Sequence, residues 1–115
     1  MIVTRENFVL AIRKLSQSDD YGFDTETFGV GRQDRLYSII IADENKTYYF
    51  NFLNEPDHLG NYPSHSLPRE LISQMQMIFN NEKSTWFAHN AKFDMAKLAL
   101  EGVEIKGRVH CTYAM

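Results

Sequence analysis

Apolar and polar positions recur with two different periods along this chain, and these periods predict a mixture of helices and strands. The segments with helical spacing carry an apolar stripe, and they run from about Arg5 to Ser16, from about Ser66 to Asn80 and from Ala91 to Glu101. The segments rich in β-branched and aromatic residues predict strands at Ile2-Val3, Tyr21 to Glu26, Leu36 to Ala42, Thr47 to Phe52, Ser84 to Ala88 and Val109 to Thr112.

The order of these segments predicts an α/β fold. The turn residues Asp43 to Lys46 join two strands into a β-hairpin beside the strand that begins at Tyr21. Helices that alternate with strands need crossover connections, so we expect a mixed sheet with an antiparallel hairpin edge, parallel strands and helices on its faces. With 115 residues, 43% of them hydrophobic, the chain is expected to form one domain over residues 1–115.

Composition narrows the choice of function and location. The formal net charge of −3 gives no globally basic surface for nucleic acid. A nuclease remains open, because metal ions and a few cations can recruit phosphate; Lys92 and Lys97 are candidates, although simple solvation is the favoured interpretation of both. No apolar stretch approaches the roughly 20 residues of a membrane span. With a single cysteine, Cys111, and no signal pattern, we expect a cytoplasmic protein without membrane association.

Two carboxylates one residue apart are the first candidate chemistry. Asp24 and Glu26 lie on one predicted strand, where alternate side chains share a face, and Thr25 points to the other face. Like charges this close repel each other unless a cation lies between them. Carboxylate oxygens suit a hard divalent ion, so we expect Mg²⁺ or Mn²⁺ here.

A third acid follows a later predicted strand. Asn90, Phe93 and Asp94 occupy the first turn of the helix that begins at Ala91, and their spacings of three and four place them on one helix face. If the two strands are neighbours, Asp94 meets Asp24 and Glu26 at one end of the sheet. Three such acids can hold two divalent ions about 3.5 to 4 Å apart, which is the arrangement for phosphodiester hydrolysis by two metals.

The two motifs together resemble a known superfamily. Phe-Asp-Thr-Glu-Thr at residues 23–27, followed by Asn-x-x-Phe-Asp at residues 90–94, is similar to the first two signature motifs of the DEDD 3'-to-5' exonucleases, which are ribonuclease H-like in fold. Within that superfamily the sequence most resembles the proofreading domain of family A, polymerase I-like and phage-type DNA polymerases. Ribonuclease D-like enzymes share both motifs, so an RNA exonuclease is an open alternative.

The resemblance implies roles for individual residues. Asp24, Glu26 and Asp94 correspond to catalytic metal ligands for Mg²⁺ or Mn²⁺ in a two-metal site. The implied partner is the 3' end of single-stranded DNA, which is the primer terminus in DNA replication. The residues implied to bind this substrate are Thr27 near the terminus, Val30 as a wedge against the terminal base, Asn90 on the strand, and Phe93 at a position that is often tyrosine.

One part of the family pattern is absent. The third motif, a Tyr or His followed four residues later by Asp, does not occur after Asp94. We therefore expect the chain to be the N-terminal portion of a longer enzyme, with further exonuclease and polymerase segments as its partners, and to be impaired by itself. Two competing hypotheses are a non-catalytic nucleic-acid-binding remnant of the fold and a fragment that cannot fold alone.

Overall fold

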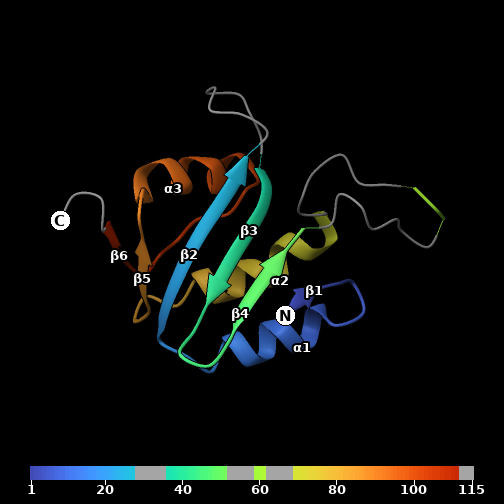
Figure 1. The fold of residues 1–115 in the computed structure, drawn as a ribbon, viewed down its shortest axis with the longest axis horizontal. Coiled ribbons are helices and arrows are strands. Elements are labelled where there is room, and N and C mark those ends of the chain that lie inside the picture. The colour runs from blue at the N-terminus through green and yellow to red at the C-terminus, as the bar shows by residue number, and fades with distance from the viewer. Residues whose placement is uncertain (28–35, 52–58, 62–68, 112–115) are drawn as a thin grey trace.

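A six-stranded mixed sheet organises the chain in the computed structural model, which describes residues 1–27, 36–51, 59–61 and 69–111 (Figure 1). Its strands are β1 (Ile2–Val3), β2 (Asp20–Thr27), β3 (Leu36–Ala42), β4 (Thr47–Phe50), β5 (Thr85–Ala88) and β6 (Arg108–Cys111). They lie side by side in the order β1-β4-β3-β2-β5-β6. Strand β2 pairs antiparallel with β3 and parallel with β5, so the predicted mixed sheet is confirmed.

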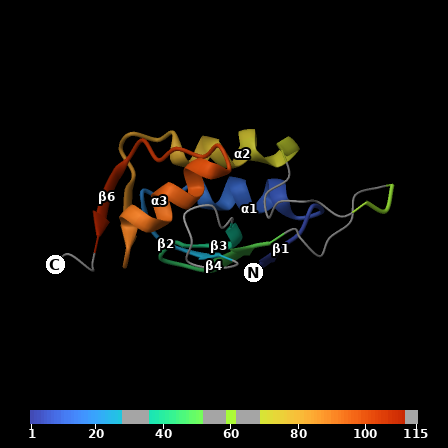
Figure 2. The same cartoon turned by 90° about the horizontal axis from the view of Figure 1, so that it is seen from above.

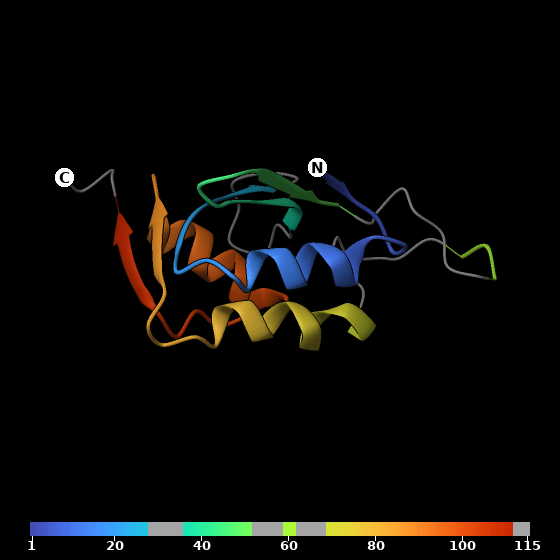
Figure 3. The same cartoon turned by 90° about the horizontal axis from the view of Figure 1, so that it is seen from below.

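Three helices cover one face of this sheet in the described part of the chain. They are α1 (Phe8–Leu15), α2 (Arg69–Phe79) and α3 (Ala91–Leu100), and Figures 2 and 3 show them on the same side of the β2, β3 and β4 strands. The burial of β2 follows this arrangement, because Tyr21, Phe23 and Thr25 are buried while Asp24 and Glu26 on the opposite face are exposed. The alternation read from the sequence therefore decides which residues of β2 face the helices. None of the described helices is long and apolar enough to cross a membrane.

The predicted hairpin forms, but it does not lie at the edge of the sheet. Asp43 Oδ1 accepts hydrogen bonds from the N–H groups of Asn45 and Lys46, both at 2.8 Å, and this holds the turn between β3 and β4. Strand β1 then pairs parallel with the outer side of β4. The amino-terminal ammonium of Met1 donates to the Thr47 carbonyl at 2.6 Å and reinforces this pairing. Two residues of strand thus cover the edge that the hairpin alone would expose.

Aromatic stacking around Trp86 forms the centre of the core. The Trp86 ring is fully buried and stacks on Tyr21 and Phe79, with ring centroids 4.3 Å and 4.6 Å away. Its indole N–H donates to the Ser84 hydroxyl at 2.9 Å, so the polar edge of the ring is satisfied inside the core. Because Tyr21 is on β2, Phe79 on α2 and Trp86 on β5, this cluster fixes the central strand against its parallel neighbour.

Some predicted boundaries shift or lie outside the described residues. The first helix begins at Phe8, because Thr4 and Asn7 bond to each other's backbone N–H, Thr4 N–H donating to Asn7 Oδ1 at 2.7 Å. Three predicted element ends fall on residues that the structure does not describe, and these are the start of the second helix at Ser66, the strand end at Phe52 and the strand end at Thr112.

Candidate metal and nucleic-acid site

One acid of each motif is hydrogen-bonded to Thr25. The Thr25 hydroxyl donates a hydrogen bond to Asp94 Oδ1 at 2.5 Å, and the Thr25 backbone N–H donates to Asp24 Oδ1 at 2.9 Å. Parallel pairing of β2 with β5 makes this contact possible, because the chain leaves β5 at Ala88 and turns at once into α3, which packs against β2. The predicted neighbourhood of the two strands is confirmed, and one residue joins an acid of β2 to an acid of α3.

Glu26 is held from the other neighbouring strand. Its Oε1 accepts a hydrogen bond from the Ser38 hydroxyl at 2.7 Å, and Glu26 and Ser38 are directly opposite each other in the β2–β3 pairing. Ser38 is fully buried, whereas the Glu26 side chain is exposed. The hydrogen bond therefore anchors a carboxylate that is open to solvent on the sheet face free of the three described helices.

Asp94 is the buried acid of the site, with 3% of its surface exposed. This burial raises the pKa of the Asp94 carboxyl above its ordinary value, the hydroxyl of Thr25 lowers that pKa, and the nearby charge of Asp24 raises it further. The Asp24 contribution is a repulsion between two negative charges, and it disfavours the charged form of Asp94. A divalent cation between them would relieve this repulsion.

Replacing Asp94 with asparagine is expected to stabilise the chain in the absence of metal. The raised pKa means that the folded state binds this proton more tightly than the unfolded state does, so stability falls as the pH rises from the ordinary value of 3.8 through the raised pKa. Asparagine removes this charge and keeps an oxygen that accepts the Thr25 hydrogen bond. Each kcal/mol gained at pH 7 adds about 4 °C to the melting temperature of a domain of this size.

Thermal melts in EDTA across the acidic to neutral range test this expectation. The stability difference between Asp94→Asn and the wild type should be present at neutral pH, shrink as the pH falls through the raised pKa of Asp94, and be lost once the pH is below the ordinary value of 3.8. A variant that is less stable than the wild type at pH 7 without metal would contradict it.

The donor set fits a hard divalent ion. Asp24, Glu26 and Asp94 offer only carboxylate oxygens, which suit Mg²⁺ or Mn²⁺ and not a soft metal. In the described ranges, no group of three His, Cys, Asp or Glu side chains gathers closely enough to hold a metal. The structure therefore joins Asp24 to Asp94 through Thr25, holds Glu26 through Ser38, and leaves the convergence of all three acids a prediction.

The other predicted substrate residues that the structure describes lie at the start of α3 and at the end of β2. Asn90 is exposed at the N-cap of α3, and its carbonyl accepts a hydrogen bond from the Asp94 N–H at 3.0 Å. Phe93 is half-buried, and Thr27 ends β2, one residue beyond Glu26. Val30 lies outside the described residues.

Lys97 departs from its expected solvated position. It is 4% exposed, and its ammonium group lies 5.4 Å from the centre of the Phe93 ring. A cation over an aromatic face is attracted to the ring, and this attraction is stronger when the pair is desolvated. The interaction therefore stabilises Lys97 in its buried position. Lys92 is exposed, as expected.

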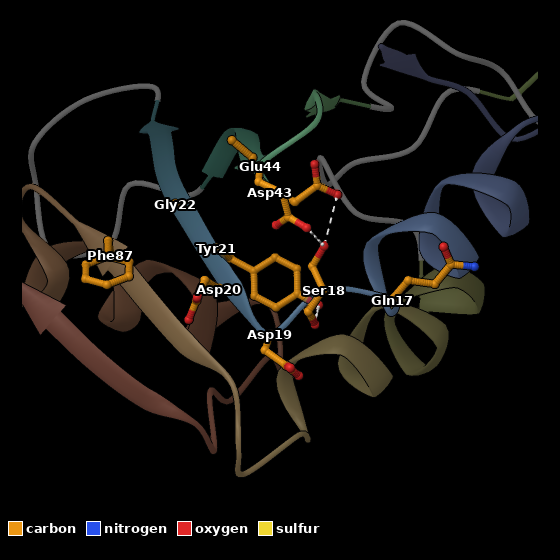
Figure 4. A pocket seen from close by; sticks show the side chains of 10 residues that line it. Gln17, Ser18, Asp19, Asp20, Tyr21, Gly22, Asp43, Glu44 and Phe87 are labelled. Carbon is orange, nitrogen blue, oxygen red and sulfur yellow. Dashed lines mark hydrogen bonds between the residues drawn. The ribbon is translucent and has the colours of Figure 1, made fainter.

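Two neighbouring hollows lie along the first half of β2. One of about 440 Å³ has Asp24 on its wall, with Ile40, Phe87 and His89 beside it, and its lining is mostly apolar. The other, of about 610 Å³, lies at the start of β2 and is rich in acids (Figure 4). In it the Ser18 hydroxyl lies 3.5 Å from Asp43 Oδ2 and 3.4 Å from Glu44 Oε1. Only the first hollow contains a residue of the predicted metal site.

Sequence reasoning assigned no function to Thr25 and Ser38, although both hold acids of the site. The position of Thr25 in the sequence could have indicated its role, because it is a polar residue on the strand face where Tyr21 and Phe23 are buried. A buried hydroxyl needs a hydrogen-bond partner, and this requirement points toward a polar group on the covering helix. No local pattern indicates Ser38, because its partner Glu26 is fixed by the register of β2 and β3.

The chain has a ribonuclease H-like exonuclease fold. The order of the strands and the helices on the sheet indicate this fold, and the acids of β2 and α3 lie in its two motifs. The sequence matches the 3'-5' exonuclease family over residues 1–115, and the chain belongs to that family. Its first two motifs are those of the DEDD type.

Solved structures share this fold at low sequence identity. Escherichia coli RNase D, an exoribonuclease involved in structured RNA processing, is 16% identical with a TM-score of 0.64, over 95% of this chain and 26% of that chain. Trypanosoma brucei RNase D in complex with RNA U12 is 18% identical with a TM-score of 0.74, over 97% and 37%. Brucella melitensis NrnC with bound Mg²⁺ is 21% identical with a TM-score of 0.60, over 86% and 44%.

The chain thus spans between 26% and 44% of the length of these solved chains. At these identities the likeness shows the fold alone. A search of the curated proteins found no match.

Proposed function

We propose that this chain acts as a metal-dependent 3'-to-5' exonuclease domain that hydrolyses phosphodiester bonds at the 3' end of a single-stranded nucleic acid. The observation that supports it most directly is the pair of hydrogen bonds from Thr25, which link one acid of each family motif to the same residue. Asp24, Glu26 and Asp94 are the proposed ligands for Mg²⁺ or Mn²⁺. When bound, the ions would supply an activated water and stabilise the leaving oxygen.

The chain's own residues would orient the substrate around these acids. Asp24 and Glu26 are exposed on the sheet face free of the three described helices, so a phosphate can approach both of them. Asn90, exposed at the start of α3, can donate its side-chain amide to a backbone phosphate. Phe93, Thr27 and Val30 are proposed to contact the terminal nucleotide, with Val30 against the terminal base.

DNA is the first proposed substrate and RNA the second. The motif at residues 23–27 resembles that of proofreading domains in family A DNA polymerases, which supports a DNA 3' end as the substrate. The solved RNase D structures of the same fold, one of them in complex with RNA U12, support RNA as the second candidate. The two differ in the 2'-hydroxyl, which a protein can read at the terminal nucleotide.

An oligonucleotide assay separates these possibilities. DNA and RNA strands of one sequence, labelled at the 5' end, are incubated with the chain in excess and Mn²⁺, and the products are resolved by length. We expect a ladder of products shortened from the 3' end, no cleavage in EDTA, and faster shortening of DNA. Faster shortening of RNA would favour the second candidate, and internal cuts or metal-independent cleavage would contradict the proposal.

A further inference from the structure

Thr25 is a polar residue on the otherwise apolar buried face of β2. Tyr21 and Phe23 on the same face are 2% and 5% exposed, and Thr25 itself is 8% exposed. Burying a hydroxyl costs free energy unless the group is hydrogen-bonded, so a valine of the same shape would suit this position better for packing alone. The hydroxyl therefore needs an explanation beyond the stability of the core.

The two hydrogen bonds of Thr25 supply that explanation. Its backbone N–H donates to Asp24 Oδ1 next to it in the strand, and its hydroxyl, on the helix-covered face of β2, donates to Asp94 Oδ1 on α3. The side chain is β-branched, which restricts rotation about its first torsion and leaves the hydroxyl few positions. The Asp94 backbone is itself held in α3 by its N–H bond to the Asn90 carbonyl. The Asp94 carboxylate thus has a rigid donor on one side and a rigid backbone on the other.

We infer that Thr25 is a positioning residue, whose hydroxyl holds the Asp94 carboxylate in the orientation in which it would bind a divalent ion. This inference rests on the proposed function. Thr25 does not touch the ion or the substrate in this role; it acts through Asp94. Residues that orient metal ligands in this way typically change metal affinity or activity about 10- to 100-fold when they are removed.

The test compares Thr25→Val, which removes the hydroxyl and keeps the shape, with Thr25→Ser, which keeps the hydroxyl. Thr85→Val serves as the matched control, because Thr85 is a strand threonine on the neighbouring β5 outside the site. The first measurement is the rise in melting temperature during a Mn²⁺ titration of the full chain. We expect the half-maximal Mn²⁺ concentration to increase about 10-fold in Thr25→Val and to stay near the wild-type value in Thr25→Ser and Thr85→Val.

The second measurement separates positioning from a merely structural role. In the oligonucleotide assay, Thr25→Val should lower the maximal rate at saturating DNA and leave the DNA concentration at half-maximal rate nearly unchanged, and added Mn²⁺ should restore part of the loss. Thr25→Ala is measured alongside in case the valine variant does not fold.

Two results would overturn the role inferred for Thr25. A Thr25→Val chain that melts at a lower temperature in EDTA but keeps the wild-type Mn²⁺ midpoint would show that the hydroxyl serves only folding, and would overturn the inference alone. A wild-type chain that shows no response to Mn²⁺ and no 3' shortening would overturn the proposed function and the inference with it.

Discussion

Replacing Asp94 with alanine will slow Mn²⁺-dependent shortening of a DNA strand by about 100- to 1000-fold, because it removes one electrostatic element of the reaction. Asp94 is the acid that α3 brings to β2, and in the proposed site it is the one ligand that α3 supplies. The rate is measured in a single turnover with the chain in excess over a 5'-labelled oligonucleotide. Asp24→Ala should have an effect of the same size, because it removes the other half of the pair joined by Thr25.

Two further variants make this result specific. Asp94→Asn keeps the volume and the hydrogen bond from Thr25, and it should lose as much activity as the alanine variant if the charge is what matters. Asp20→Ala removes an exposed acid from the same face of β2 as Asp24, at the end remote from the site, and should retain the wild-type rate. Equal losses in Asp20→Ala and Asp94→Ala, or full activity in Asp94→Ala, would show that the site lies elsewhere.

Mn²⁺ should raise the stability of the wild-type chain by mass action, because the ion binds the folded state and relieves the repulsion between Asp24 and Asp94. At a free concentration 100 times the dissociation constant, the gain in the free energy of unfolding is about 2.7 kcal/mol. For a domain of this size this corresponds to a rise of roughly 10 °C in the melting temperature. Thermal melts at increasing Mn²⁺ concentration measure this gain, and no substrate is needed.

The control for metal stabilisation is the same melt in Asp24→Ala. That variant lacks one ligand and the charge that repels Asp94, so its melting temperature should respond far less to the ion. An equal response in the wild type and the variant would place the bound ion outside the proposed site. A wild-type chain whose melting temperature does not change with Mn²⁺ would show that the proposed site does not bind the ion.

Local periodicity in the sequence determined most of the fold and part of the site. The alternation along β2 places Asp24 and Glu26 on one face and Thr25 on the other, because successive side chains of a strand point in opposite directions. Asp43 predicts the turn of the hairpin because its side chain satisfies the backbone of that turn. The start of α3 directly after β5 predicts that Asp94 lies at the end of a strand. Each of these features depends on residues close together in the sequence.

Tertiary structure decided the contacts between distant segments. Thr25 and Asp94 are 69 residues apart, and only the parallel pairing of β2 with β5 brings them together. The burial of Lys97 depends in the same way on how α3 packs onto the sheet, which a pattern of charges along one helix does not contain. A hydrogen bond or a desolvated charge depends on the group opposite it, and the sequence alone does not say which distant group that will be.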